Sequence, residues 1–247
     1  MIMLRRLIIL VLLLAPAAAQ AQGVPLINAV ADGAQTTRYS LNIEIVLLMT
    51  AITLLPSMLL VMTPFVRIIV VMSLLRQALG TGQTPPNQVL VGLALFLSVF
   101  VMSPVIGAVY EQALVPYLGN KVTFDQAVDA AQKPVREFML KQTRQQEIAS
   151  FMQIARNPPT LEAKDVPFST LVPAFITSEL KSAFTIGFLI YIPFVVIDLI
   201  VASVLMSMGM MMLSPMIISM PLKLMLFVLV DGWSLTIGSL AASFVTP

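Results

Sequence analysis

Three consecutive methionines, Met210, Met211 and Met212, are the residues of this sequence whose type and spacing point to specialised chemistry. Gly209, which weakens a helix, precedes them, and Pro215, which cannot continue one, follows them. In a continuous helix three neighbours point about 100° apart, whereas a break between two helices can direct all three thioethers into one space. The residues therefore predict a helical hairpin with methionine at its tip and hinges at Gly209 and Pro215. The alternative is ordinary packing, because methionine often fills gaps in a core.

Two ionisable residues lie within the apolar segments on either side of this tip. Asp198 precedes Met212 by 14 residues, and Lys223 follows it by 11. In an antiparallel hairpin this mismatch is about 4.5 Å along the axis, a distance that side chains can bridge. An ionised group in an apolar helix costs several kcal/mol unless it is paired or hydrated. We therefore expect Asp198 and Lys223 to be buried charges that pair, within a subunit or between neighbours in an assembly.

Catalytic mechanisms that depend on cysteine or histidine do not fit the remaining residue types. The sequence contains no cysteine and no histidine, which removes disulfides, thiol chemistry, the commonest metal ligand and the commonest general base. A serine–lysine or two-carboxylate mechanism stays formally open, but there is no nucleophile elbow and no zinc-binding helix. The turn Gly80-Thr-Gly-Gln-Thr-Pro lacks the Lys-Ser/Thr that completes a phosphate loop. We expect no catalytic residue, no metal and no cofactor.

The composition indicates a membrane protein. Hydrophobic residues make up 58% of the chain and charged residues 11%, and the mean hydropathy is +0.95, whereas soluble domains average about 25% charged residues. A net charge of +2 without a dense basic patch excludes a nucleic-acid partner. The predicted fold class is an all-α integral membrane protein, with four long apolar helices arranged as helical hairpins and a small helical extracytoplasmic domain.

The N-terminus has the three parts of a secretory signal peptide. Arg5 and Arg6 precede an apolar run that is too short to span a bilayer, and Ala19-Gln20-Ala21 places small residues where a signal peptidase cleaves. Cleavage after Ala21 would leave residues 22–40 as a polar, flexible N-terminal arm outside the cytoplasm. The alternative is an uncleaved anchor.

Residues 41–110 are predicted to form the first apolar helix pair, with a cytoplasmic loop near residues 77–87. Pro56 is expected to kink the first helix without ending it. Arg67 and Arg76 are almost the only cations near a membrane boundary in this part of the chain. By the positive-inside rule they mark the cytoplasmic side.

Residues 111–181 differ in composition from the segments on either side. Acidic and basic residues are equal in number there, and the apolar residues have amphipathic helical spacing, which predicts a small polar helical domain on the extracytoplasmic side. Pro134 is expected to end one of its helices, and Asn157-Pro158-Pro159 is expected to end the next.

Residues 182–233 are predicted to form the second apolar pair. The third apolar helix is expected from Thr185 to Met208, and the fourth from Ile217 to Val230, with the methionine turn between them. Trp233 follows at a position typical of an aromatic interface belt. Residues 234–247 are predicted to be a C-terminal tail.

Four stretches of the chain resemble the FliP/SctR family of export-gate subunits of bacterial type III secretion systems. The resemblance covers nearly the whole mature chain. The predicted signal peptide and long extracytoplasmic domain of this chain are more similar to those of the flagellar branch of the family than to those of the virulence branch. The most specific stretches are Phe65–Arg76, Leu79–Phe96, Pro173–Lys181 and Ile197–Met212.

The resemblance implies a pore subunit of the flagellar protein export gate. Such a subunit would form a homo-oligomer, expected to be a pentamer, that assembles helically with the two other small export-gate subunits of the flagellar basal body. It would pass unfolded flagellar proteins across the bacterial cytoplasmic (inner) membrane, with a ring of Met210, Met211 and Met212 sealing the closed pore. Expected partners are those subunits, exported unfolded polypeptides and membrane lipid. The resemblance also implies that the apolar helices enter the membrane as spans, and that in the finished complex they lie largely above the bilayer plane.

Two other classes of function stay open. A small-solute or ion transporter could use Asp198 and Lys223 as a relay, although such transporters usually show inverted repeats with paired broken helices, and only one such break is visible. A membrane-anchored scaffold for the polar domain is the third interpretation. It fits less well, because the richest sequence detail lies in the apolar helices.

Overall fold

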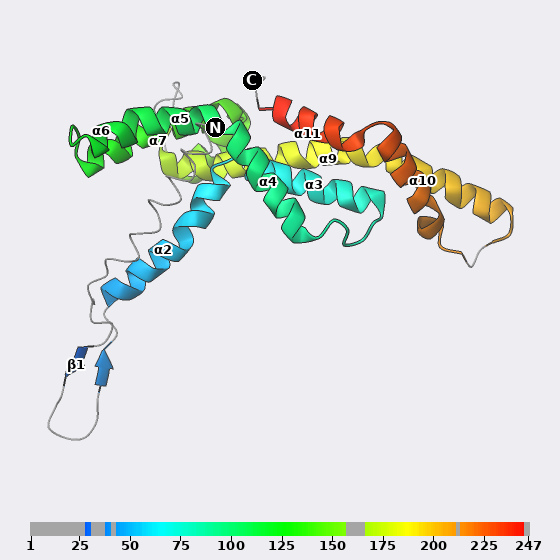
Figure 1. Cartoon of the computed structure of the whole chain (residues 1–247), viewed down its shortest axis with the longest axis horizontal. Coiled ribbons are helices and arrows are strands. Elements are labelled where there is room, and N and C mark those ends of the chain that lie inside the picture. The colour runs from blue at the N-terminus through cyan, green and yellow to red at the C-terminus, as the bar shows by residue number, and fades with distance from the viewer. Residues whose placement is uncertain (1–27, 31–37, 41–42, 157–165, 211–212, 245–247) are drawn as a thin grey trace. The chain divides into compact units, whose positions relative to one another are not determined.

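The computed structural model describes residues 28–30, 38–40, 43–156, 166–210 and 213–244. The chain divides by its internal contacts into two compact units, residues 1–57 and 58–247. Figure 1 traces the elements of each unit along the chain. The predicted signal peptide, residues 1–21, lies outside the described residues.

The first unit contains a short strand pair and most of one helix. Strand β1 (Asn28–Val30) pairs antiparallel with β2 (Arg38–Ser40), with Ala29 opposite Tyr39. Polar composition alone predicted a flexible arm here, because strands of three residues leave almost no alternation to detect. Helix α2 (Ile43–Val61) begins in this unit and continues through Pro56, as expected.

The second unit begins with a helix and a tight turn. Pro64 precedes α3 (Phe65–Leu79), and Gly80 ends it in the left-handed conformation (φ 75°) with its N–H bonded to the Gln77 carbonyl at 3.0 Å. Only glycine adopts that conformation without steric cost, so Gly80 is a helix-ending residue. The chain then turns through residues 80–86 into four consecutive helical segments: α4 (Asn87–Val101), α5 (Ser103–Val109), the π-helical η2 (Tyr110–Leu114) and α6 (Val115–Leu118).

The polar domain contributes two amphipathic helices, α7 (Phe124–Gln142) and α8 (Gln145–Ile154). A capping box between Thr123 and Gln126 starts α7. The expectation that Pro134 ends a helix is wrong, because α7 runs through it. A proline removes one backbone hydrogen bond, and the apolar face of α7 packs on both sides of Pro134, with Ala127 and Met139 buried. That packing carries the helix past the missing bond.

The C-terminal part forms a long helix and a returning hairpin. Helix α9 runs unbroken from Phe168 to Ser207 with Pro173 and Pro193 inside it, so it begins well before the expected Thr185. Helices α10 (Pro215–Leu229) and α11 (Gly232–Ala242) follow. Helix α11 occupies most of the segment predicted as a C-terminal tail.

The core of the second unit lies where α3 packs along α9 (Figure 1). Gly187 of α9 allows this approach, because a Cβ at that position would lie 2.2 Å from Cδ1 of Leu74. One apolar cluster joins the start of α3, α4, the middle of α9 and the end of α11, and a second joins the end of α3 to the α9–α10 hairpin. A third lies under α7 and α8. Their buried members are Ile68, Val71, Met72, Leu90, Ala94, Ala183, Leu240 and Phe244; Leu75, Ala78, Leu79, Phe194 and Phe227; and Met139, Met152, Val166, Leu171 and Phe175.

Within the described residues, one helix is long and apolar enough to cross a membrane alone, namely α9. Three pairs of consecutive helices would also pass if each bent pair were one span, which would give up to four. The described residues are nearly all helical, which confirms the prediction of an all-α fold. That four apolar helices span a membrane stays a prediction. The pairs are Val46–Val61 with Phe65–Leu79, Asn87–Val101 with Ser103–Leu118, and Pro215–Leu229 with Gly232–Ala242.

Candidate functional sites

Helix α9 ends in a hydrogen-bonded glycine turn at Gly209, immediately before the methionines. Gly209 has φ 76°, its N–H bonds to the Met206 carbonyl at 3.0 Å, and the Met210 N–H bonds to the Leu205 carbonyl at 3.0 Å. This pair of bonds is the Schellman ending of a helix, which requires a left-handed residue at the position of Gly209. The side chain of Met210 is 40% exposed beyond this end. Met211 and Met212 lie outside the described residues.

The far side of the tip is built by Pro215. It is the first residue of α10, where its missing N–H costs nothing because the first helical N–H groups have no partner within the helix. A Cβ on Gly80 would lie 3.9 Å from Cγ of Met216, so the turn after α3 approaches the start of α10. Gly209 and Pro215 thus bracket the tip, as their types suggested, while their action as hinges stays a prediction.

Asp198 and Lys223 meet across the α9–α10 hairpin. The Lys223 ammonium lies 2.6 Å from Oδ2 of Asp198, and the Ser219 hydroxyl donates to Oδ1 at 2.5 Å. The two charged side chains differ in exposure, at 4% for Lys223 and 34% for Asp198, so only the lysine is a buried charge within the chain. Ser219, which is fully buried, did not figure among the residues singled out in the sequence.

Lys223 also connects the hairpin to the end of α3. Its ammonium donates to the Ala78 carbonyl at 3.1 Å. Ala78 lies in the last turn of α3, whose carbonyls have no partner within the helix and carry the negative end of the helix dipole. The ammonium is therefore held between a carboxylate and a helix C-terminus, and both favour its charge.

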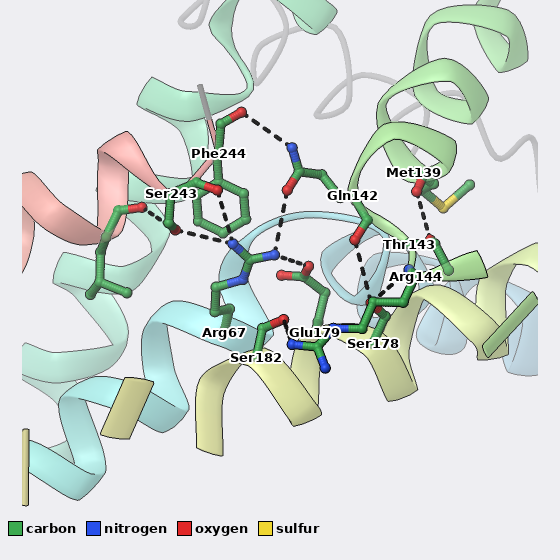
Figure 2. A network of polar contacts seen from close by, with 11 residues as sticks. Arg67, Met139, Gln142, Thr143, Arg144, Ser178, Glu179, Ser182, Ser243 and Phe244 are labelled. Atoms are coloured by element: carbon green, nitrogen blue, oxygen red, sulfur yellow. Dashed lines mark hydrogen bonds and ion pairs between the residues drawn. The ribbon is translucent and has the colours of Figure 1, made fainter. Parts of the chain in front are cut away.

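A second ion pair, not foreseen in the sequence, lies in the middle of the fold. Arg67 of α3 donates from Nη2 to Oε1 of Glu179 in α9, and the two side chains are 5% and 0% exposed (Figure 2). The same nitrogen lies 3.4 Å from Oε1 of Gln142 at the end of α7. Three helices thus converge on one guanidinium, whose planar fork can bind several acceptors at once.

The end of the C-terminal helix also contacts this guanidinium. Nη1 of Arg67 donates to the Ser243 hydroxyl at 3.0 Å and to the Ser243 carbonyl at 3.3 Å. The Phe244 ring stacks on the guanidinium, with Cζ 3.9 Å from the ring centroid, and the Phe244 carbonyl accepts from Nε2 of Gln142 at 3.2 Å. Figure 2 shows these contacts gathered around Arg67. The arrangement fixes the polar domain and the apolar helices to one another.

The two arginines predicted to mark the cytoplasmic side have different surroundings. Arg76 donates to the Pro85 carbonyl at 3.1 Å and to Oδ1 of Asn87 at 2.6 Å, so it braces the turn after α3. Arg67 is buried instead, as described above. The positive-inside rule counts cations near a surface. Arg76 is therefore the arginine that supports a cytoplasmic location for this turn, and that location stays a prediction.

The sequence contained a signal for the Arg67–Glu179 pair. The rule that drew attention to Asp198, a charge within an apolar helix, applies equally to Arg67 and Glu179. Hairpin counting paired Asp198 with Lys223 because they flank one turn, whereas Arg67 and Glu179 are 112 residues apart. No counting rule links such distant positions.

Large apolar side chains remain exposed on several helices. They include Phe96 and Phe100 on α4, Leu199 and Ile200 on α9, and Ile217 and Val228 on α10. Exposed apolar surface on this scale marks contact with lipid or with other chains. In the part of the chain that the structure describes, no three acidic residues lie close enough together to hold a metal ion.

The fold and these sites define a class of protein: an apolar helical protein with bent pairs of helices, a polar helical domain and a hairpin whose first helix ends just before the methionines. The model of the FliP family matches residues 48–240. The chain is 56% identical over 222 residues to the flagellar biosynthetic protein FliP of Cereibacter sphaeroides, covering 90% of this chain and 73% of that protein. It is 55% identical over 206 residues to the FliP of Pectobacterium carotovorum subsp. carotovorum (83% and 80%), and 51% over 205 residues to that of Bacillus subtilis strain 168 (83% and 93%).

The chain therefore belongs to the FliP family. Membership makes it a component of the flagellar export apparatus, associated with the membrane. The resemblance inferred from the sequence is confirmed.

Proposed function

We propose that this chain is a pore-forming subunit of the flagellar export gate, and that Met210, Met211 and Met212 seal the closed pore. The observation that carries the proposal is the geometry on either side of the tip: α9 has a Schellman ending at Gly209, Met210 is exposed just beyond it, and α10 starts at Pro215. Membership of the FliP family supports the export role.

Methionine suits a seal that must open for a polypeptide. A closed pore has to exclude water and ions, yet a passing chain presents side chains of every kind. Charged rings would bind the substrate, and rigid aromatic rings would resist widening. A thioether on an unbranched chain is apolar and has several rotatable bonds, so it can close a constriction by excluding water and repack around a passing chain.

The proposed assembly is a homo-oligomer of five copies with the two other small export-gate subunits, in the cytoplasmic membrane at the flagellar basal body. The exposed apolar side chains of α4, α9 and α10 support contacts with other subunits and lipid. The mature N-terminus and the polar domain would face away from the cytoplasm. Unfolded flagellar proteins would be the transported substrates.

Purification from membranes in mild detergent, followed by mass measurement, tests the assembly. The expected result is a stable particle with several copies of this chain and accompanying subunits. Deletion of the gene should abolish flagellar secretion and motility together. A purified monomer without partners, together with flagellar secretion that continues after the gene is deleted, would contradict the proposal.

A small-solute transporter using Asp198 and Lys223 as a relay is the second candidate. The 2.6 Å contact and the partial exposure of Asp198 favour it, since a relay needs a charge pair that water can reach. Reconstituted protein should then carry a solute or ion in a saturable way, and Asp198→Asn should abolish that transport while the mass of the particle stays the same.

A further inference from the structure

Helices α9 and α10, which form the methionine hairpin, contain few residues that could fix how one helix aligns with the other. Between Lys181 and Asp231, the charged residues are Asp198 and Lys223 alone. In α10 the polar residues are Ser219 and Lys223, and every other position is apolar. Apolar side chains pack acceptably in more than one register, since volume and pattern matter more than any single contact.

In the observed register all three polar residues are matched to one another. Ser219 and Lys223 lie four residues apart, on one face of α10, and each holds a different oxygen of Asp198, at 2.5 Å and 2.6 Å. Sliding α10 by one turn, about 5.4 Å, would leave at least one of these donors opposite an apolar side chain. Ser219 is completely buried, and after a slip its hydroxyl would keep only the Met216 carbonyl of its own helix, at 3.2 Å, in place of the charged acceptor at 2.5 Å.

The same group fixes the hairpin to the body of the protein. The Lys223 ammonium also donates to the Ala78 carbonyl at 3.1 Å, and Phe227, one turn further along α10, packs with Leu75 and Leu79 of α3. A slip of α10 would therefore break contacts with α3 and with α9 together. Buried polar groups that specify register at little gain in stability are known from coiled coils.

We propose that Ser219, Asp198 and Lys223 form a register key that sets the alignment of α9 and α10, and with it the position of the methionine tip. Ser219 and Lys223 are thus positioning residues for the seal, and that second part of the inference rests on the proposed function. A tip displaced by one turn in some subunits would leave a ring of methionines at unequal heights.

The test replaces the key by apolar groups of similar size in the full-length protein, purified from membranes with its accompanying subunits. The variant is Asp198→Leu, Ser219→Ala and Lys223→Met together. Because the chain has no cysteine, spin labels can be placed on Phe184→Cys and Ile217→Cys, both exposed positions. Labelled subunits diluted among unlabelled ones report the distance within one hairpin. Pulsed electron paramagnetic resonance measures it.

The expected result is a wild-type yield with a broadened distance distribution or a second distance shifted by about 5 Å, one helical turn. Two matched controls should keep one narrow distance. Ser207→Ala removes a hydroxyl bonded only to its own helix, and Glu137→Gln with Lys141→Gln removes an exposed ion pair. A single unchanged distance in the triple variant would overturn the proposal.

If the triple variant does not fold, the single variant Ser219→Ala, which keeps the ion pair, tests the proposal instead. It should show a minor population at the shifted distance, and a distribution identical to wild type would again overturn the key. Ion leakage, measured on the same variants, separates this inference from the seal. A shifted register without leakage leaves the key standing and contradicts the seal. Leakage in the methionine variants, together with an unchanged register in the triple variant, supports the seal and contradicts the register key.

Discussion

At the scale of single residues, the ion pair of Asp198 and Lys223 is asymmetric. Lys223 is buried and also bonded to the Ala78 carbonyl, whereas water reaches a third of Asp198. Removing the aspartate leaves a buried ammonium without its carboxylate, which typically costs about 3–5 kcal/mol. Removing the lysine leaves a carboxylate that water and Ser219 still stabilise, so the cost is smaller.

Asp198→Ala should therefore reduce recovery of the oligomer more than Lys223→Ala does, as measured by size-exclusion chromatography of detergent extracts. The exchange Asp198→Lys with Lys223→Asp should restore only part of it, because a carboxylate would then face the Ala78 carbonyl. Lys141→Ala is the control. Its partner Glu137 is exposed, and although the Lys141 hydrogen bond and charge lower the pKa of Glu137, assembly should not change. Equal and normal assembly in both single variants would exclude a role for the pair.

The Arg67 network leads to a second prediction at this scale. Arg67→Met should destabilise the protein by about 3–5 kcal/mol, because Glu179 is completely buried and would lose its cation. Adding Glu179→Met should recover much of that loss, since an apolar pair requires no compensating charge. Thermal unfolding of the detergent-solubilised protein measures both. Glu179→Met alone is measured as well, and a double variant whose loss equals the sum of the losses in Arg67→Met and Glu179→Met would show that the pair is not coupled.

At the scale of elements, the close approach of α3 and α9 depends on Gly187. Gly187→Ala would place a methyl group 2.2 Å from Cδ1 and 3.2 Å from Cβ of Leu74, so the two helices must separate or Leu74 must change rotamer. Such overpacking costs about 1–3 kcal/mol, which exceeds the gain of about 1 kcal/mol from alanine in a helix. We expect a lower unfolding temperature.

Two variants check the cause of that shift. Adding Leu74→Ala to Gly187→Ala should relieve the clash and raise the unfolding temperature again. Gly238→Ala in α11 meets no atom within 4 Å, so it should leave stability unchanged or raise it slightly. An unfolding temperature that Gly187→Ala does not lower would mean that the helices are not held at this distance.

Element boundaries followed from the sequence where a single residue type ends a helix, and failed where packing decides. Gly80 and Gly209 end α3 and α9 because only glycine takes their left-handed conformations without strain. Pro134 and Pro173 lie inside helices despite their type, because contacts made by the rest of each helix offset one lost hydrogen bond. The strand pair at residues 28–30 and 38–40 is too short for periodicity to show.

The same distinction applies to the candidate sites. The Asp198–Lys223 contact could be predicted because both residues lie at similar distances from one turn. Ser219 could not, since a serine in an apolar helix usually bonds to its own backbone. The Arg67–Glu179 pair joins α3 to α9 and depends on how the helices pack, which local pattern does not determine.

At the scale of the whole molecule, we expect one topology in the membrane. A reporter in the turn at residues 80–87 should behave as cytoplasmic, because Arg76 contacts that turn and cations near a membrane boundary favour the cytoplasmic side. A reporter within residues 121–164 should behave as extracytoplasmic. We predict removal of the signal peptide after Ala21, so N-terminal sequencing of the membrane-purified protein should begin at Gln22. Reversed reporter activities, or an intact Met1, would contradict this topology.

The most direct test of the account measures whether the methionines close a pore. In the assembled export complex, Met210, Met211 and Met212 are changed together to Ala, and in a matched variant to Leu, and ion conductance is recorded in membranes. Because α9 ends before Met210 and α10 begins at Pro215, the substitutions should leave the packing of both helices intact, and assembly should persist in each variant. The account predicts a clear leak with alanine, and no leak but slower export with leucine, whose branched side chain repacks less readily. An alanine variant that assembles normally and conducts no more ions than wild type would contradict the seal.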